Sequence, residues 1–386
     1  MGSSISAEQA RAVVDAFAIE GQCLAVDGFE RGHIHDTFVS TWVAADGERR
    51  RFLHQRINDK VFTDVPALMN NIAVVTGHLA RCYGAPESEG HMRALRLVPT
   101  RENAPYLRTP DAPWRTYVFV EGTRSFDRCD GYGQAREAAR AFGQFQADLI
   151  DLDVGSLRET IPNFFSSPYR LRQLEAAIME DPVGRLRSVR ADVAFVQERR
   201  TMIESIEKAI REGRFPVRIV HGDTKLNNLL FDERTGRAVC VVDLDTCMPA
   251  WSLYDFGDLV RFTAARCRED ETDLSLAGTH FELYRALVDG YLESAGSFLT
   301  PDEIELMPLA GRLVTLTVGM RFLADHIAGD RYFKVHHEGH NLERARVQFA
   351  MVRDMERQQG SMLHWVRSCV SKRTIVTGRA REAAEG

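Results

Sequence analysis

The stretch His221-Gly-Asp223-Thr-Lys225-Leu-Asn-Asn228 decides the fold that this sequence predicts. It follows the apolar run 217–220, and a second apolar run, 238–243, begins after the turn residues 232–236. Apolar runs of this length bounded by turn residues are typical of buried strands. We expect the two strands to be adjacent and to deliver four polar side chains to one end of a hairpin-like unit: Asp223, Asn228, Asp243 and Asp245.

The spacing of these polar residues is typical of phosphoryl transfer from ATP. His221, Asp223 and Asn228 match the H-x-D-x-x-x-x-N spacing of protein-kinase catalytic loops. In such a loop the Asp orients the attacking hydroxyl and accepts its proton, whereas the Asn and a later Asp hold Mg²⁺. The spacing therefore predicts Asp223 as the base, with Asn228 and Asp243 as metal ligands. The alternative is structural, because Asp and Asn also serve as turn and cap residues.

A second candidate for the metal-binding acid lies further along the chain. Asp255-Phe-Gly257 has the D-F-G sequence of protein kinases, but it does not end a strand directly after the catalytic loop. Asp243 occupies that place, so we assign the metal to Asp243. Asp255 is expected to brace the catalytic loop through hydrogen bonds, and His221 and Lys225 are expected to support the same loop.

The remaining pattern predicts an α+β protein of two parts. Residues 1–120 contain a helix at 6–19, a hairpin around Asp46-Gly47, a helix at 65–81 and strands at 92–98 and 114–120. Residues 121–372 carry mostly helical patterns, and the tail 373–386 has few anchoring apolar residues and is expected to fray. We expect a bilobal fold with a small antiparallel sheet and a larger helical part. The predicted helices of the second part are 133–152, 168–179, 185–212, 273–295 and 301–329.

Composition narrows the class of protein. Lys and Arg number 49 against 55 Asp and Glu, and this net charge of −6 argues against nucleic-acid binding. The chain has no run of 18 uncharged apolar residues, so no membrane span is expected. Seven cysteines at irregular spacing, without a C-x-x-C pair, favour reduced thiols. Because no secretory signal is evident, we expect a cytoplasmic protein. The sequence predicts no oligomeric state.

Several motifs resemble a known superfamily of kinases. HGDTKLNN at 221–228 followed by VVDLDT at 241–246 is similar to the aminoglycoside phosphotransferase and choline kinase superfamily, whose fold is protein-kinase-like. Longer motifs resemble the N-acetylhexosamine 1-kinases, over about residues 20–358. They include GHIHDTF at 32–38, WRTYVFVEGTRSFD at 114–127, DLDTCMPAWSLYDFGDLVRF at 243–262 and MRFLADHIAGDRYFKVHHEGHNLERARVQ at 320–348.

The resemblance implies transfer of the γ-phosphate of ATP, with Mg²⁺, to the anomeric hydroxyl of N-acetylglucosamine or N-acetylgalactosamine. It implies Asp245 as a second metal ligand. It also implies Gly28 and Gly32 over the phosphates, and backbone groups from Phe119 to Glu121 at the adenine. For the sugar it implies a set of five side chains, which are His33, Asp36, Arg321, Tyr332 and Arg344.

The sequence departs from kinase-like folds at one ion pair. Such folds usually carry a Lys on the third strand, but the strand 51–57 offers Gln55 and Arg56. Side chains alternate along a strand, so only one of the two faces the cleft; Arg56 is the candidate, because a guanidinium can hold phosphate as a planar fork. The helix 65–81 contains no Asp or Glu to complete a Lys–Glu pair. Either Asn70 or Asn71 substitutes by hydrogen bonding, or the pair is absent.

Other functions stay open at the level of the sequence. The same superfamily includes kinases of aminoglycosides, choline, homoserine and other small alcohols, and fold alone does not choose the acceptor. A nucleotide-binding module without turnover and a helical interaction protein are two further classes. The presence of Asp223, Asn228 and Asp243 together argues against both of them.

Overall fold

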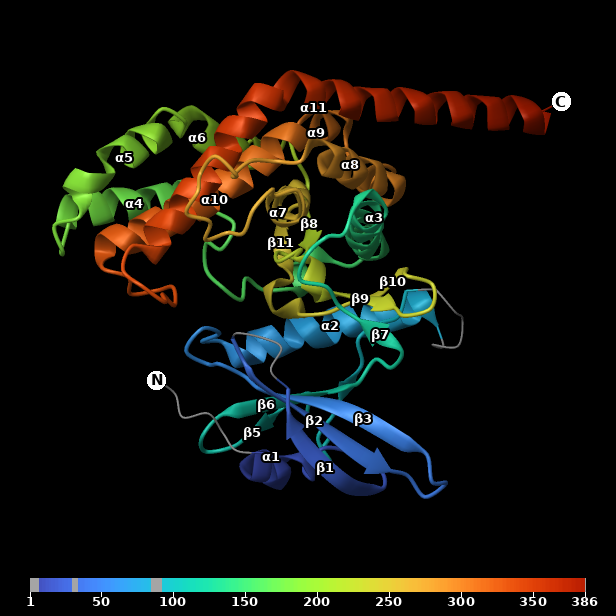
Figure 1. Ribbon diagram of the computed structural model, residues 1–386. Helices are drawn as coiled ribbons and strands as arrows, with labels where there is room; N and C mark the ends of the chain where they lie inside the picture. The colour runs from blue at the N-terminus through green and yellow to red at the C-terminus, as the bar shows by residue number, and fades with distance from the viewer. Residues whose placement is uncertain (1–6, 30–33, 85–91, 386) are drawn as a thin grey trace. The chain divides into compact units, whose positions relative to one another are not determined.

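The computed structural model describes residues 7–29, 34–84 and 92–385. It divides into two compact units, neither of which is one continuous stretch of sequence. The first unit comprises residues 1–125, 151–162 and 229–249, and the second comprises 126–150, 163–228 and 250–386. A small antiparallel sheet and a larger helical part confirm the predicted α+β class (Figure 1). The lobe boundary at residue 120 remains a prediction.

The first unit is built on a six-stranded antiparallel sheet. Its main path is β1 (Gln22–Gly28), β2 (Asp36–Val43), β3 (Arg49–Arg56), β6 (Pro113–Val118) and β4 (Leu97–Val98), and β5 (Leu107–Arg108) also pairs with β6. The predicted hairpin is β2–β3, in which Val43 pairs with Arg49. The predicted strand 92–98 is shorter than expected, because only its last two residues pair with β6.

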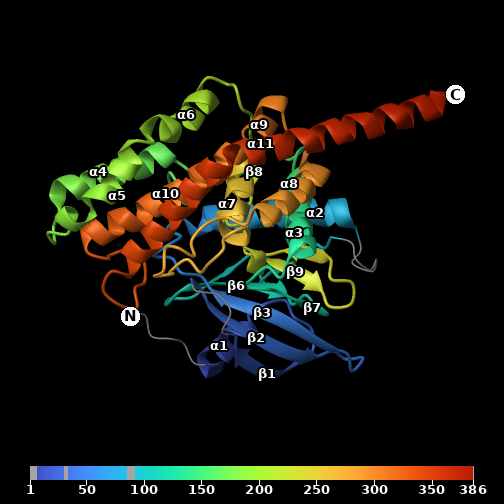
Figure 2. The same cartoon turned by 45° about the horizontal axis from the view of Figure 1, so that its top comes forward.

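One face of this sheet packs against helix α1 (Ala7–Val14), as Figure 2 shows. The buried cluster joins Ala10 and Val14 of the helix region to Phe38, Trp42 and Trp114 of the strands. The second helix of this unit is α2 (Val65–Tyr83). The Asp64 carboxylate caps α2 by accepting the Ala67 N–H, and Pro66 occupies the first turn, where no intrahelical donor is needed.

His54 is enclosed within the sheet face that α1 covers. Its side chain is 1% exposed and lies between Ser40 Oγ at 2.6 Å and Thr116 Oγ1 at 2.8 Å. Because burial penalises the charged imidazolium, it lowers the pKa of His54 to about 4.

We expect His54 to make the protein less stable in mild acid. A histidine whose pKa falls on folding binds its proton more tightly in the unfolded chain, so stability is complete above about pH 6.5 and is lost toward pH 4. The free energy of unfolding should fall by up to about 3 kcal/mol across this window. Urea unfolding at pH 7, 5.5 and 4.5 measures the slope. His54→Gln should flatten it, whereas His364→Gln, at an exposed position, should not; equal slopes in both variants would contradict the prediction.

Three further strands of the first unit form a small sheet in the order β10 (Ala238–Val241), β9 (Leu229–Asp232) and β7 (Thr123–Arg124). This sheet corrects the predicted strand pairing. The run 217–220 is β8 (Val217–Val220), and it pairs with β11 (Met248–Trp251) instead of with β10. The tight turn that follows β9 explains the difference, because Asp232 Oδ1 accepts the Arg234 and Thr235 N–H groups and folds the chain directly back.

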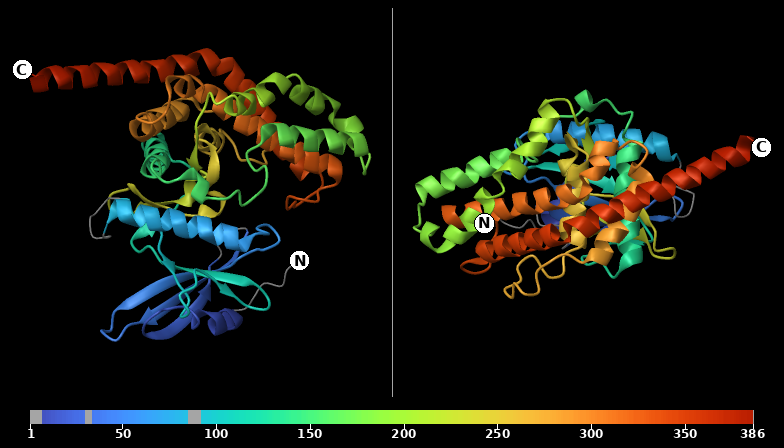
Figure 3. Two further views of the ribbon diagram at one scale, coloured as in Figure 1. Left: turned by 180° about the vertical axis from the view of Figure 1, so that it is seen from behind. Right: turned by 90° about the horizontal axis from the view of Figure 1, so that it is seen from above.

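The second unit is helical and larger than the first. Figure 3 shows α10 and α11 lying side by side, with α4 packed along α10. The helices are α3 (Tyr132–Asp148), α4 (Ser167–Glu180), α5 (Arg190–Gln197), α6 (Arg200–Arg211), α7 (Leu253–Thr263), α8 (Phe281–Ala295), α9 (Pro301–Glu305), α10 (Met307–Ala328) and α11 (His340–Glu385). No helix in the described part of the chain is long and apolar enough to span a bilayer.

The predicted helices differ from the observed ones mainly by breaks. The predicted helix 185–212 contains a 3-10 turn and then α5 and α6, and the predicted helix 301–329 is interrupted at Leu306 between α9 and α10. Residues 273–280 precede α8 and do not belong to it. Residues 373–385 continue α11 as a helix, and their fraying remains a prediction.

Candidate active site

Asp223 and Asn228 lie together in the loop that follows β8 in the second unit. Asn228 Nδ2 donates to the Asp223 carbonyl oxygen at 2.8 Å and to Asp223 Oδ2 at 3.1 Å. Lys225 Nζ lies 3.0 Å from Asp223 Oδ1. Burial opposes the charge on Lys225, but the Asp223 carboxylate outweighs it and raises the pKa of Lys225. The loop thus holds one carboxylate between an amide and a cation.

Asp255 fixes the backbone of this loop from helix α7. Its carboxylate accepts the His221 N–H and the Gly222 N–H, each at 2.8 Å, and the side-chain amide of Gln146 on α3 at 2.6 Å. Gly222 has φ +84°, a conformation that glycine adopts without strain. These bonds are the ones that the predicted bracing role of Asp255 requires. The sequence did not single out Gln146, because it lies in a different part of the chain.

Two more contacts complete the support of the catalytic loop. The Asp258 carboxylate accepts the Thr224 N–H at 2.9 Å, and the Thr224 hydroxyl donates to the Asp255 carbonyl oxygen at 2.8 Å. The His221 ring is fully buried and makes T-shaped contacts with two phenylalanine rings. The ring centroids lie 5.3 Å apart for Phe142 and 5.7 Å apart for Phe145. His221 therefore anchors the loop in the core of the second unit.

The D-F-G triplet is a helix-packing element in this protein. Asp255, Phe256 and Gly257 lie in the first half of α7, where Phe256 is fully buried. A Cβ on Gly257 would approach the Ala310 carbonyl oxygen of α10 to 2.5 Å, so only glycine permits the two helices to pack this closely. The packing of α7 against α10 thus explains the residues of this triplet without a metal-binding role.

Asp243 lies directly after β10 in the first unit, where the chain makes a sharp turn into residues 244–246. The side chain is exposed, and the backbone is left-handed with φ +60°. Leu229 pairs with Val241, so the chain enters β9 and leaves β10 at the same end of the hairpin. Asn228 is the residue that precedes Leu229 in the sequence.

Asp245 has a different environment from the one that the resemblance implied. It is 2% exposed, and both carboxylate oxygens accept hydrogen bonds from the Arg115 guanidinium. His35 Nε2 lies 2.5 Å from Asp245 Oδ2. Arg115 and His35 outweigh the effect of burial and lower the pKa of Asp245. Both oxygens are thus engaged by protein donors, whereas the resemblance implied a second metal ligand, and that role remains a prediction.

Alternation along β3 puts Gln55 and Arg56 on opposite faces of the sheet, and the choice of Arg56 for the phosphates remains a prediction. Gln55 is the direct cross-strand partner of Arg115, and its Oε1 accepts from Arg115 Nε at 2.9 Å. Arg56 pairs across the sheet with Trp114, on the opposite face, and its Nη1 donates to Asp36 at 3.2 Å. The side chain that shares a face with Asp245 is therefore Gln55.

Asn70 and Asn71 of α2 bind main-chain groups and do not substitute for an ion pair with β3. Asn71 is fully buried, and its side chain bonds both main-chain groups of Arg158 and donates to the Cys247 carbonyl oxygen at 3.0 Å. Asn70 donates to the Ser156 carbonyl oxygen. Helix α2 is thereby tied to the turn that follows Asp243.

The residues predicted to contact the nucleotide lie in the first unit. Gly28 ends β1 opposite Phe38, whereas Gly32 and the predicted sugar residue His33 lie outside the described residues. The Phe119 N–H donates to the Arg51 carbonyl oxygen, and the Glu121 side chain pairs with Arg51. At the two residues predicted to lie at the adenine, the Phe119 N–H and the Glu121 side chain therefore already bond to Arg51 of β3.

Three of the predicted sugar residues come together in the second unit. The Arg321 guanidinium lies 5.7 Å from the Tyr332 ring centre and 5.3 Å from that of Phe333. Arg344 lies 5.5 Å from the Phe322 ring, which packs on Phe333. The fourth residue, Asp36, lies in the first unit and pairs with Arg56.

A buried carboxylate organises the loop that carries Tyr332. Asp325 is 7% exposed and accepts the N–H groups of Arg331, Tyr332 and Phe333, each at 2.8 or 2.9 Å. Asn341 Nδ2 donates to the same carboxylate at 2.9 Å. This buried acid therefore fixes the backbone of the loop at residues 331–333.

Arg170 of α4 lies beside Arg321 and was not predicted from the sequence. Arg170 is 9% exposed. Burial lowers the pKa of Arg170 to about 10, and the nearby positive charge of Arg321 contributes to the same shift. Burial also lowers the pKa of Arg321. Within the described residues neither guanidinium has a carboxylate at salt-bridge distance, and Arg170 Nε has no hydrogen-bond partner. Two cations are thus held together without a protein anion.

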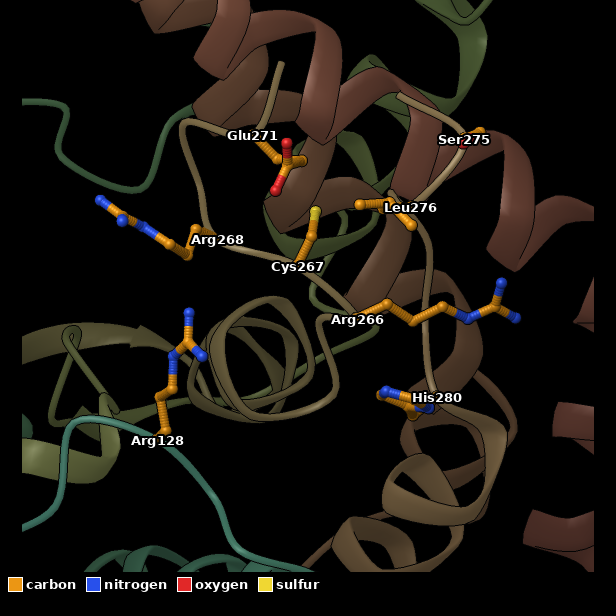
Figure 4. A pocket seen from close by; sticks show the side chains of 8 residues that line it. All are labelled: Arg128, Arg266, Cys267, Arg268, Glu271, Ser275, Leu276 and His280. Carbon is orange, nitrogen blue, oxygen red and sulfur yellow. The ribbon is translucent and has the colours of Figure 1, made fainter. Parts of the chain in front are cut away.

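A separate pocket of about 460 Å³ opens on the loop between α7 and α8 (Figure 4). Its lining contains Arg128, Arg266, Arg268 and His280 together with Glu271. Arg266 is also within 3.5 Å of Asp354, and Arg268 is paired with Asp270. None of the predicted site residues lines this pocket, so it is distinct from the predicted active site.

The described residues contain no group of three or more His, Cys, Asp or Glu side chains arranged to hold a metal on their own. Mg²⁺ does not require such a cage, because it is usually bound through one or two carboxylates, waters and the phosphates of a substrate. Asn228 and Asp243 supply oxygen donors of this kind. The chemistry of the donor set therefore fits a magnesium-bound nucleotide.

The small antiparallel sheet, the helical unit and the braced H-x-D loop define the class of kinase-like phosphotransferases. The chain belongs to the phosphotransferase enzyme family, whose match covers residues 42–292.

Solved structures of kinases share the fold at low sequence identity. An aminoglycoside phosphotransferase from Alicyclobacillus acidocaldarius is 15% identical with a TM-score of 0.57, over 94% of this chain and 96% of its own. An amicoumacin kinase in complex with AMP-PNP and Ca²⁺ is 14% identical with a TM-score of 0.55, over 90% and 94%. A choline kinase from Cryptosporidium parvum is 12% identical with a TM-score of 0.55, over 89% and 93%. These likenesses establish the fold.

Proposed function

We propose that this phosphotransferase is an ATP- and Mg²⁺-dependent kinase that phosphorylates the anomeric hydroxyl of an N-acetylhexosamine. The observation that carries the acceptor class is the pair of the buried Arg170 and the half-buried Arg321 beside Tyr332, for which no described residue supplies a carboxylate at salt-bridge distance. Such a site suits hydroxyl and carbonyl oxygens and repels a cationic acceptor. The motif similarity to N-acetylhexosamine 1-kinases supports the same choice. The cationic choline and aminoglycosides, and homoserine, are the alternatives.

The proposed reaction gives a role to each of four residues. Asp223 accepts the proton of the attacking hydroxyl, and Lys225 and Asn228 hold its carboxylate in one orientation. The Asn228 amide nitrogen donates to Asp223, so Asn228 would contribute its amide oxygen, and Asp243 its carboxylate, to holding the metal. The metal, when bound, neutralises charge on the transferred phosphate. The ATP-analogue and Ca²⁺ complex of the amicoumacin kinase supports a nucleotide with a divalent ion in this role.

The test is a substrate screen with a positional readout. The purified protein is incubated with ATP and Mg²⁺ and with N-acetylglucosamine, N-acetylgalactosamine, choline, an aminoglycoside or homoserine, and ADP release is measured. Phosphorus NMR then identifies the hydroxyl that is phosphorylated. A sugar 1-phosphate is the expected product. ADP release with choline or an aminoglycoside alone would replace the proposed acceptor, and none with any alcohol would contradict kinase activity toward them.

We expect Arg321→Met to weaken acceptor binding selectively. Hydrogen bonds from a charged donor contribute about 1.5–3 kcal/mol, so the KM for the sugar should rise about 10- to 150-fold. The KM for ATP should stay within about twofold, since the removed bonds contact only the acceptor. The matched control is Arg312→Met, which removes a half-buried arginine from the same helix where it contacts Gln359. Equal changes in both KM values would count against an acceptor role for Arg321.

A further inference from the structure

Arg115 is at the centre of a buried polar cluster in the first unit. The side chain is 1% exposed, although it carries a full charge. Its two terminal nitrogens donate to the two oxygens of Asp245, and its Nε donates to Gln55. The guanidinium also lies 5.4 Å from the ring centre of Tyr117. Three of the five N–H groups of Arg115 are thus engaged within the cluster, one on each of its nitrogens.

The cluster holds Asp245 from three sides. His35 Nδ1 accepts the Asn58 N–H at 3.0 Å, so the ring proton lies on Nε2 and is donated to Asp245. The His35 ring stacks on Phe62 at 5.6 Å, which fixes its plane. The Thr160 hydroxyl donates to the main-chain carbonyl oxygen of Asp245 at 3.0 Å. Both the side chain and the backbone of Asp245 are therefore immobilised.

The immobilised residue is two positions after Asp243. The same turn is fixed at its far end, where Asn71 donates to the Cys247 carbonyl oxygen. Burial opposes the charge of Arg115, but the carboxylate of Asp245 and, less strongly, that of Asp243 outweigh it and raise the pKa of Arg115. The exposed Asp243 thus lies on a turn whose flanking residues are clamped and whose charge acts on a buried arginine.

We propose that Arg115 is a positioning residue for the metal ligand Asp243. Through Asp245 it fixes the turn at 243–247. The buried Arg–Asp pair joins β6 to this turn, in a unit that lacks the usual Lys–Glu pair between β3 and α2. The proposal rests on the part of the proposed function that concerns the magnesium-bound nucleotide, and it does not depend on the acceptor.

The test measures the effect of Mg²⁺ on nucleotide binding, with AMP-PNP as the probe. Calorimetry gives the Kd of AMP-PNP with and without Mg²⁺ for the wild type and for Arg115→Lys, which keeps the charge but cannot hold both oxygens of Asp245 in a planar fork. We expect the tightening by Mg²⁺ to fall at least about tenfold in Arg115→Lys, the size of one lost charge-assisted hydrogen bond. The Kd without Mg²⁺ should stay within about twofold.

The matched control is Arg93→Lys, which changes another arginine of the same unit, 3.8 Å from Asp232. It should leave the Mg²⁺ effect unchanged. A wild-type Mg²⁺ effect in Arg115→Lys would overturn the proposal. If Arg115→Lys does not fold, Thr160→Val replaces it, since this variant removes one bond to the turn and leaves the ion pair intact; an unchanged Mg²⁺ effect there would also overturn the proposal. A failure of the sugar screen leaves this experiment unaffected, because no acceptor is present.

Discussion

Replacing Asp223 with Asn should lower kcat by about a thousandfold, because the attacking hydroxyl then has no group to accept its proton. The amide has the shape of the carboxylate, so the loop should keep its fold, supported by Asp255 and Asp258. Steady-state ADP release and the melting temperature are measured in parallel.

Asp59→Asn is the control for Asp223→Asn. It makes the same chemical change at an exposed position outside the candidate site, and it should retain wild-type activity. A retained kcat in a folded Asp223→Asn protein would show that another group accepts the proton.

The second prediction with a large effect distinguishes Asp243 from Asp255, since each resembles the metal-binding Asp of protein kinases in one respect. Asp243→Asn should reduce turnover at least about a hundredfold and raise the Mg²⁺ concentration needed for half-maximal rate, because a neutral amide binds a hard cation less strongly. Its melting temperature should change little, since Asn tolerates the left-handed backbone of this position.

Asp255→Ala should show the opposite pattern, in which stability is lost first. It leaves the buried His221 and Gly222 N–H groups without their acceptor, at about 1–3 kcal/mol for each group. For a chain of this size the melting temperature should fall by about 2–7 °C. Differential scanning calorimetry and an Mg²⁺ titration distinguish the two variants. A loss of Mg²⁺ response without destabilisation in Asp255→Ala would reverse the assignment of the two acids.

The local features of the candidate site were predictable from the sequence. The spacing from His221 to Asn228 reflects contacts within one loop, and the position of Asp243 follows from the apolar run before it. The same holds for the β2–β3 hairpin, whose turn and alternating strands are close in the sequence. The helix break at Leu306 was missed although Pro308, in the first turn of α10, is a typical helix-start residue. The break between α5 and α6, at residues 198–199, has neither glycine nor proline.

The contacts between distant parts of the chain were not predictable in the same way. Arg115 and Asp245 are separated by 130 positions, and nothing near either residue indicates the other. The pairing of β10 with β9 was missed for a different reason, because the strands are close in the sequence but the apolar residues 229–231 show no alternation and directly follow the loop 221–228. One indirect signal was present: a kinase-like chain that lacks the usual Lys and Glu must place a buried ion pair elsewhere or omit it.

The left-handed backbone at Asp243 has a consequence for the natural variation that this position can tolerate. Glycine accommodates φ +60° but offers no oxygen to a cation, and glutamate offers a carboxylate but disfavours that backbone. Asparagine meets the conformational demand and keeps an oxygen, at the expense of charge. Aspartate alone provides both the left-handed backbone and a charged oxygen ligand. We therefore expect this position to be restricted to aspartate, and a homologue with another residue here to have lost turnover.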